Sequence, residues 1–184
     1  MKRNVERIDI DLDINFTSAQ IDEILTSEYL IDQGLIRYFN SQNQSNLAVD
    51  VCELMANRHQ AVIVERIHDY SLSLRNAMQT VSNYFNWNDQ PKTAYLFISP
   101  SLSGSFGVHF DLEHVYLYCT EGIKTMEVEV NGEFVEYLLN KGEGLFIPKG
   151  VRHKATNQDT AVSVSFGLET YLENQIREYS NAAD

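Results

Sequence analysis

The pattern of hydrophobic and polar residues divides the chain into a first half of mixed periodicity and a second half of short alternating runs. Residues 7–16, RIDIDLDINF, place an aliphatic residue at every second position, which predicts a half-buried strand. Residues 17–25 and 71–87 space their apolar residues as helices do, and Thr17 or Ser18 can cap the first of these helices. The first half is therefore expected to combine helices with strands.

Three shorter segments complete the first half. Residues 32–40 and residues 61–67 are each expected to hold a short strand, the latter because it is a β-branched run. Residues 41–58 begin polar and then take on helical spacing. One face of that expected helix consists of Leu47, Val51, Leu54 and Met55.

From Thr93 the chain changes to strand-like runs separated by turn clusters. The runs are residues 93–99, 115–120, 125–131, 133–139, 143–149 and 160–169. Asn131-Gly132 is a strong signal for a two-residue hairpin, and EGIK, residues 121–124, is expected to be another turn. Short antiparallel strands at this spacing predict a jelly roll or a barrel.

No internal repeat and no low-complexity linker interrupts the sequence, so we expect a single domain over residues 1–184. Residues 1–92 would supply helices and strands that buttress the β core of residues 93–168, and residues 169–184 would form a short C-terminal helix. The expected fold class is mainly β with N-terminal α/β elements.

Composition narrows the range of partners. The 184 residues carry a formal net charge of −12, which disfavours binding to nucleic-acid phosphates and suits a cationic peptide or an amine, although solubility alone also explains such a charge. The N-terminus shows no secretory signal, and no apolar run approaches the ~18 residues of a membrane span. Cys52 and Cys119 form no metal-binding or disulfide pattern, so we expect reduced thiols in the cytoplasm.

The stretch FGVHFDLEHV, residues 106–115, contains the main candidate for chemistry. In a strand, His109 and Asp111 would point to the same face, and His153 after a proline-containing turn could supply a third ligand. Two imidazoles and one carboxylate make the facial triad of non-haem Fe(II) oxygenases. The alternative is a hydrogen-bonded structural pair near a turn. His114 would point away from such a metal and is expected to be structural or to contact substrate.

Two longer segments resemble the JmjC-type cupin hydroxylases, a family of Fe(II)- and 2-oxoglutarate-dependent oxygenases. Residues 95–130 are similar to the part of the family in which a Ser/Gly-rich loop leads into the His-x-Asp motif. Residues 141–157 and 161–169 resemble the second part, which carries the last metal ligand, with Glu143 where an aspartate is usual. The sequence pattern of the two segments is most similar to that of the bacterial and nucleolar branch that hydroxylates ribosomal proteins. The resemblance implies a double-stranded β-helix of the cupin type, buttressed by helices.

The resemblance also implies roles for individual residues. His109, Asp111 and His153 match the three metal ligands, and Lys124 matches the basic residue that holds the distal carboxylate of 2-oxoglutarate. Without the family, Lys124 would be interpreted as a solvated lysine in a hairpin turn. Ser165 and Tyr95 fall where polar side chains could contact the co-substrate.

Three hypotheses for function follow. In the first, the protein hydroxylates a peptide, an amino-acid side chain or a small biosynthetic molecule with Fe(II), 2-oxoglutarate and O₂, as a monomer or a homodimer. In the second, a metal-dependent cupin works without 2-oxoglutarate, as a dioxygenase or an isomerase. In the third, a cupin-like module binds a ligand without catalysis. Loss of 2-oxoglutarate affinity in Lys124→Ala would separate the first hypothesis from the other two.

Overall fold

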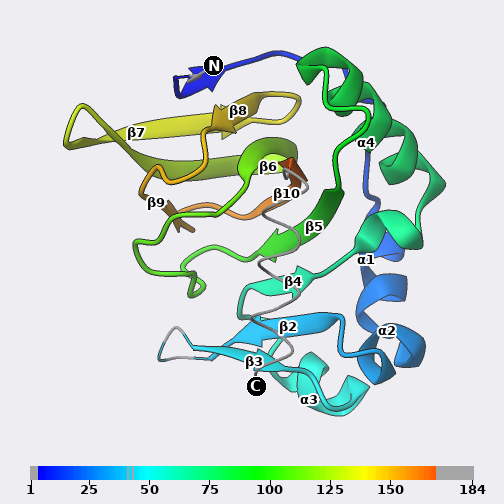
Figure 1. Cartoon of the computed structure of the whole chain (residues 1–184). Helices are drawn as coiled ribbons and strands as arrows, with labels where there is room; N and C mark the ends of the chain where they lie inside the picture. The colour runs from blue at the N-terminus through cyan, green and yellow to red at the C-terminus, as the bar shows by residue number, and fades with distance from the viewer. Residues whose placement is uncertain (1–3, 41, 43, 169–184) are drawn as a thin grey trace, which may run out of the picture.

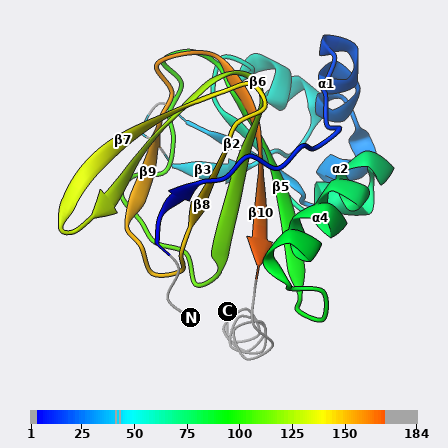
Figure 2. The same cartoon turned by 90° about the horizontal axis from the view of Figure 1, so that it is seen from above.

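A computed structural model describes residues 4–40, 42 and 44–168, and within them the chain forms one antiparallel sheet of ten strands with helices along one side (Figures 1 and 2). The strand order is β1-β8-β6-β10-β5-β4-β2-β3, and β7 and β9 both pair with β6. The strands are β1 (Glu6–Arg7), β2 (Ile36–Phe39), β3 (Ser45–Leu47), β4 (Val62–Val64), β5 (Lys92–Ser99), β6 (His114–Val130), β7 (Glu133–Asn140), β8 (Gly144–Ile147), β9 (His153–Thr156) and β10 (Ala161–Leu168). This is the mainly β, jelly-roll architecture that the sequence predicts.

The strands β2, β3 and β4 of the first half extend the same sheet beyond β5 instead of forming a separate layer. The helices are α1 (Ser18–Leu25), α2 (Glu28–Asp32), α3 (Val51–Ala56) and α4 (Leu72–Phe85), with a 3-10 turn at Ile67–Asp69. Thr17, one of the two predicted capping residues, caps α1 and forms a full capping box with Gln20. Leu74, Val81 and Phe85 of α4 are buried against the sheet.

The long strand β6 corrects the expectation of a turn at residues 121–124. Its first residues pair with β8 and β10, and residues 123–130 pair with β7, so one strand joins both parts of the jelly roll. Gly122 has a φ of +74°, and a side chain there would collide with the carbonyl oxygen of Thr160. Just before this glycine, the pairing of β6 with β10 shifts register between Cys119 and Glu121, so a β-bulge redirects the strand without ending it. The predicted hairpin at Asn131-Gly132 is confirmed, with both residues at positive φ.

Two other predictions need correction. In residues 7–16 only Arg7 belongs to a strand, as part of β1, although Ile8, Ile10, Leu12 and Ile14 are buried in alternation. The hydroxyls of Tyr116 and Tyr118 donate to the carbonyl oxygens of Ile8 and Leu12, so side chains provide the partners that a strand neighbour would otherwise supply. Leu47 ends β3 and does not belong to the helix that begins at Val51, because Asp50 caps that helix.

The two faces of the sheet differ in what covers them. On the side of the helices, the main core contains fully buried Tyr116, Phe146 and Phe166. The opposite face is covered by the segment before β6 and by β9, a strand that sequence reasoning took for a turn followed by a histidine. Among the described residues, no helix is both long and apolar enough to cross a bilayer. The expected C-terminal helix, residues 169–184, lies outside the described residues, so the single-domain boundary stays a prediction.

Candidate metal and co-substrate site

A cavity of about 430 Å³ opens on the face of the sheet that the helices do not cover. Its floor comes from the central strands, and its rim comes from β9 and the segment that precedes β6. All six residues that the sequence singled out line it: His109, Asp111, His153, Lys124, Ser165 and Tyr95. The fold therefore brings the candidate residues together from four strands and one loop.

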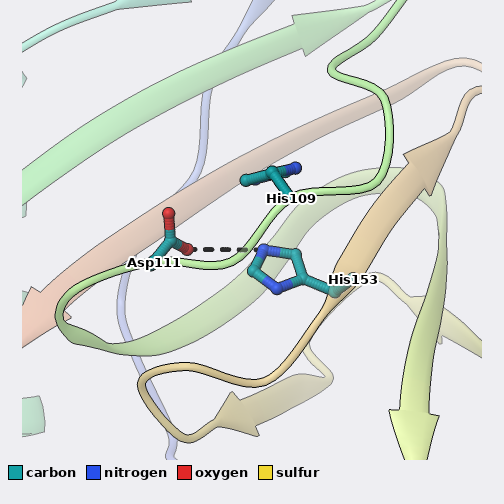
Figure 3. Close-up of side chains that lie close together, drawn as sticks. All are labelled: His109, Asp111 and His153. Carbon is teal, nitrogen blue, oxygen red and sulfur yellow. Dashed lines mark ion pairs between the residues drawn. The ribbon is translucent and has the colours of Figure 1, made fainter.

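His109 and Asp111 lie in an irregular segment and not in a strand. A single β-bridge ties this segment to β9: the amide of His109 donates to the carbonyl oxygen of His153 over 3.0 Å, and the reverse bond measures 2.8 Å. The amide of Gly150 donates to the carbonyl oxygen of Asp111 and holds the other end of the motif. The three side chains converge as a result (Figure 3), and their ligand atoms all lie within 4.8 Å of one another.

Both imidazoles have their Nδ1 atoms against backbone carbonyl oxygens. His109 Nδ1 lies 2.8 Å from Gly107 O, and His153 Nδ1 lies 2.9 Å from Val151 O. These contacts assign the ring proton to Nδ1 and leave Nε2 available as a metal ligand. Two imidazole nitrogens and one carboxylate form a donor set that fits Fe(II).

Asp111 and His153 contact each other directly, with Oδ2 and Nε2 3.3 Å apart (Figure 3). Burial alone would lower the pKa of His153, but the bond to Asp111 and the bond to the Val151 carbonyl raise it above the ordinary value. The carboxylate thus occupies the side of the ring that a metal ion would use.

Lys124 lies in the same cavity and is 3% exposed. Its ammonium group donates to Ser99 Oγ over 3.1 Å and to Asn157 Oδ1 over 3.0 Å, both of them neutral acceptors. Burial lowers the pKa of Lys124 to about 8. Over the described part of the chain, no carboxylate comes within ion-pair distance of Lys124. A buried ammonium without a counter-ion is costly, and an anionic ligand in the cavity would offset that cost.

Asn157 is a site residue that sequence reasoning missed. Its Oδ1 accepts from Lys124, while its Nδ2 donates to Ser103 Oγ over 3.1 Å and to Gly104 O over 3.0 Å. It therefore links the buried lysine to the Ser/Gly-rich loop before the His-x-Asp motif. Its position directly after the end of β9 depends on long-range pairing, and no local sequence signal marks it.

The remaining candidates occupy different surroundings. Ser165 on β10 and Tyr95 on β5 are paired neighbours on the cavity floor. His114 does not line the cavity, and its ring packs against Trp87 and Phe146. Of the aromatic residues near the motif, only Phe106 lines the cavity: Tyr116 and Tyr118 belong to the core on the helical side, and Phe110 is exposed.

Comparison with known proteins identifies the fold. No protein-family model and no curated protein sequence matches the chain. Among solved structures, YcfD, a ribosomal oxygenase from Escherichia coli in complex with cobalt and succinic acid, matches with a TM-score of 0.71 and 14% identity, covering 91% of this chain and 48% of that one. A second structure of YcfD matches with a TM-score of 0.70 and 13% identity, covering 97% of this chain and 51% of that one.

A third structure of the same enzyme, in complex with cobalt and 2-oxoglutarate, matches with a TM-score of 0.66 and 12% identity, covering 91% of this chain and 48% of that one. The present chain therefore has the fold of a ribosomal oxygenase, as the sequence resemblance implied. It spans about half the length of the solved structures that it matches.

Proposed function

We propose that the protein is an Fe(II)- and 2-oxoglutarate-dependent oxygenase that hydroxylates an unactivated C–H bond. The observation that carries this proposal is the pairing of two features in one cavity: a His-Asp-His triad and a buried lysine that lacks a carboxylate partner among the described residues. A triad alone fits many metal-dependent cupins. The uncompensated ammonium adds a requirement for an anionic ligand close to the metal.

Each residue has a distinct task in this proposal. His109, Asp111 and His153 hold the metal on one side and leave its remaining positions open for ligands. Lys124 has three N–H donors, two of which are used by Ser99 and Asn157, so the third can bind the distal carboxylate of 2-oxoglutarate. When bound, the metal and 2-oxoglutarate supply the oxidising chemistry.

Ser165 and Tyr95 are proposed to orient the co-substrate from the floor. Each carries a hydroxyl and lies on a strand next to the other, so together they can bond the middle of a ligand whose far end reaches Lys124. The apolar side chains Leu117, Met126 and Ile147 line the same cavity and exclude water from it.

The comparisons support the proposal through their ligands. The similar enzyme YcfD has been solved with cobalt together with 2-oxoglutarate or succinic acid. The substrate class of the present chain is proposed more broadly: a peptide, an amino-acid side chain or a small biosynthetic molecule. A cytoplasmic location is proposed because neither Cys52 nor Cys119 is in a disulfide.

An anaerobic titration tests the proposal. Fe(II) is added to the metal-free protein, followed by 2-oxoglutarate, and the visible spectrum is followed for the weak charge-transfer band of a chelated 2-oxo acid. The band is expected in the wild type and is expected to weaken strongly in His109→Ala and Lys124→Ala. Iron binding without the band would contradict the co-substrate and favour a cupin that uses its metal differently. Absence of metal binding would favour the ligand-binding module.

A further inference from the structure

The cavity extends beyond the triad to strands of the first half, because Phe39 of β2, Ser45 of β3 and Ile63 of β4 also line it. Phe39 of β2, Ile63 of β4 and Phe97 of β5 form an apolar cluster on its floor. The ring of Phe106 connects this end to the triad, because it lies 4.7 Å from the ring of Phe39 and 5.3 Å from that of His109, centroid to centroid. The ring of Phe106 therefore lies between a ligand on this floor and the proposed metal site.

An oriented arginine lies beyond the apolar floor. Arg37 lines the cavity, and its Nε donates to Glu65 Oε1 over 2.8 Å. About a third of each side chain is exposed, so the pair stands at an opening and not in the core. The bond through Nε fixes the plane of the guanidinium but uses only one of its five N–H groups. Within residues 4–40, 42 and 44–168, the terminal nitrogens of Arg37 make no other hydrogen bond or ion pair.

A second polar group faces the same end of the cavity. Ser45 of β3 is paired with Phe39, so its side chain lies on the cavity face next to the arginine. Its hydroxyl oxygen is buried and finds no hydrogen-bond partner within the described part of the chain. Buried hydroxyls are ordinarily satisfied, so this one is available to a ligand in the cavity.

We propose that Arg37 binds a carboxylate of the substrate, with Ser45 as a further donor. The inference rests on the proposed function and specifies its substrate class: a molecule with an apolar segment between its carboxylate and the carbon that is oxidised. The planar fork of a guanidinium suits a carboxylate because two parallel N–H groups can donate to its two oxygens. Glu65 acts as a positioning residue, since it orients the fork without contacting the substrate.

The cationic groups in the cavity are opposite in sign to the net charge of the chain. The net charge of −12 favours a cationic partner for the surface as a whole. Inside the cavity, however, Lys124 and Arg37 form two separate anion sites, one buried among Ser99 and Asn157 and the other at the opening beside Glu65. The first would take the co-substrate and the second the substrate, so two anions can bind without competing for one cation.

Equilibrium binding of a matched probe pair tests this assignment. The probes are N-acetyl-L-phenylalanine and its amide, which share an aromatic body and differ in charge. They are titrated into Mn(II)- and 2-oxoglutarate-loaded protein under anaerobic conditions, and the dissociation constant is measured by calorimetry. The wild type is expected to bind the acid about tenfold more tightly than the amide.

Three variants locate the preference. Arg37→Met should bind the acid as weakly as the amide, and Arg37→Lys should recover only part of the preference, because it keeps the charge and loses the fork. Glu65→Gln should give a ratio of amide to acid dissociation constants between those of the wild type and Arg37→Met. Melting temperatures of the variants show that each is folded. Equal binding of acid and amide by the wild type, failure of both probes to bind, or an unchanged ratio in Arg37→Met would each overturn the proposal.

A separate control distinguishes this inference from the proposed function. Lys124→Met should lose 2-oxoglutarate and keep the preference for the acid over the amide when the metal-loaded variant is titrated without co-substrate. Arg37→Met should lose the preference for the acid over the amide and retain 2-oxoglutarate affinity. If neither variant affects 2-oxoglutarate while Arg37→Met still abolishes the acid preference, the co-substrate proposal fails and the carboxylate site stands.

Discussion

The two faces of the central sheet differ in their surroundings: one packs against the helices and the other lines the cavity. Adjacent residues of β10 belong to each face. Phe166 points toward the helices, where it is fully buried and its ring packs against that of Tyr116. Ser165, one position earlier, lines the cavity. On the helical face, the hydroxyls of Tyr116 and Tyr118 are satisfied within the fold, since they donate to the carbonyl oxygens of Ile8 and Leu12.

The cavity face instead contains polar groups that the fold does not satisfy. Lys124 has no carboxylate partner and Ser45 no hydrogen-bond partner among the residues that the structure describes. Burial without compensation lowers stability, so such groups are more informative about function than well-packed ones. We therefore expect substitutions on the helical face to affect stability alone. Substitutions on the cavity face should affect ligand binding, in some cases with a gain in stability.

The largest effect on the cavity face is expected from removing a metal ligand. His153→Ala should weaken Mn(II) or Fe(II) binding by at least about 100-fold, because two remaining ligands cannot hold the ion at the same affinity. The exposed His59 provides the control, and His59→Ala should leave metal affinity unchanged. Anaerobic calorimetry measures both. Equal metal affinity of the two variants would show that the triad is structural.

The largest effect on the helical face is expected from Phe166→Ala. It should lower the free energy of unfolding by about 3–5 kcal/mol, because it removes a fully buried aromatic ring and leaves a cavity. Ser165→Ala, its neighbour on the other face, should change stability by less than about 1 kcal/mol. Chemical denaturation checks both values. A larger loss of unfolding free energy in Ser165→Ala than in Phe166→Ala would contradict the distinction between the faces.

The pH dependence of co-substrate binding sharpens the comparison further. The folded pKa of Lys124, about 8, is depressed relative to the unfolded value of roughly 10.4. The lysine is charged below the folded pKa and loses its proton above it, so 2-oxoglutarate affinity should fall about tenfold per pH unit above pH 8.

The stability of the ligand-free protein should move the other way. Between the folded and the unfolded pKa of Lys124, the unfolded chain binds more protons, so this residue makes the folded state more stable as the pH rises through that window. Both measurements, affinity by calorimetry and stability by denaturation, are made on wild type and on Lys124→Met. Identical pH profiles of the two proteins would contradict the assignment of the titrating group.

A smaller effect is expected at Asn157. Asn157→Ala removes one acceptor from the lysine ammonium and should weaken 2-oxoglutarate binding about fivefold. Asn157→Asp keeps the shape but supplies a carboxylate, which would pair with the ammonium and compete with the co-substrate, so its loss of affinity should be larger. If the aspartate variant bound 2-oxoglutarate as well as the wild type, Lys124 would not be the anchor.

The residues of the site were predictable from the sequence to different degrees, for physical reasons. The His-x-Asp motif is local, and His153 follows a recognisable turn, so spacing and family resemblance singled out three residues that lie close together in the fold. The strand position of Lys124 was missed because β6 continues past Gly122, whose close approach to Thr160 joins residues far apart in the sequence and leaves no local signal. Asn157 and Arg37 reach the cavity only through long-range pairing, which no local pattern encodes.

The same distinction applies to the fold. Alternation correctly predicted which of residues 7–16 are buried, since burial requires only a repeating apolar side. It failed to predict their pairing, because the tyrosine hydroxyls of β6 satisfy the backbone there. Leu47 fitted a helical face by spacing, yet pairing with Arg37 placed it in β3.

The most direct test of the account combines two measurements on Lys124→Met, a substitution of similar size without charge. The account predicts that 2-oxoglutarate binding to the Mn(II)-loaded variant falls at least about 100-fold, while the free energy of unfolding of the ligand-free protein rises by about 1 kcal/mol at neutral pH. Unchanged 2-oxoglutarate affinity together with a loss of stability would show that the buried lysine is a structural residue and would contradict the account.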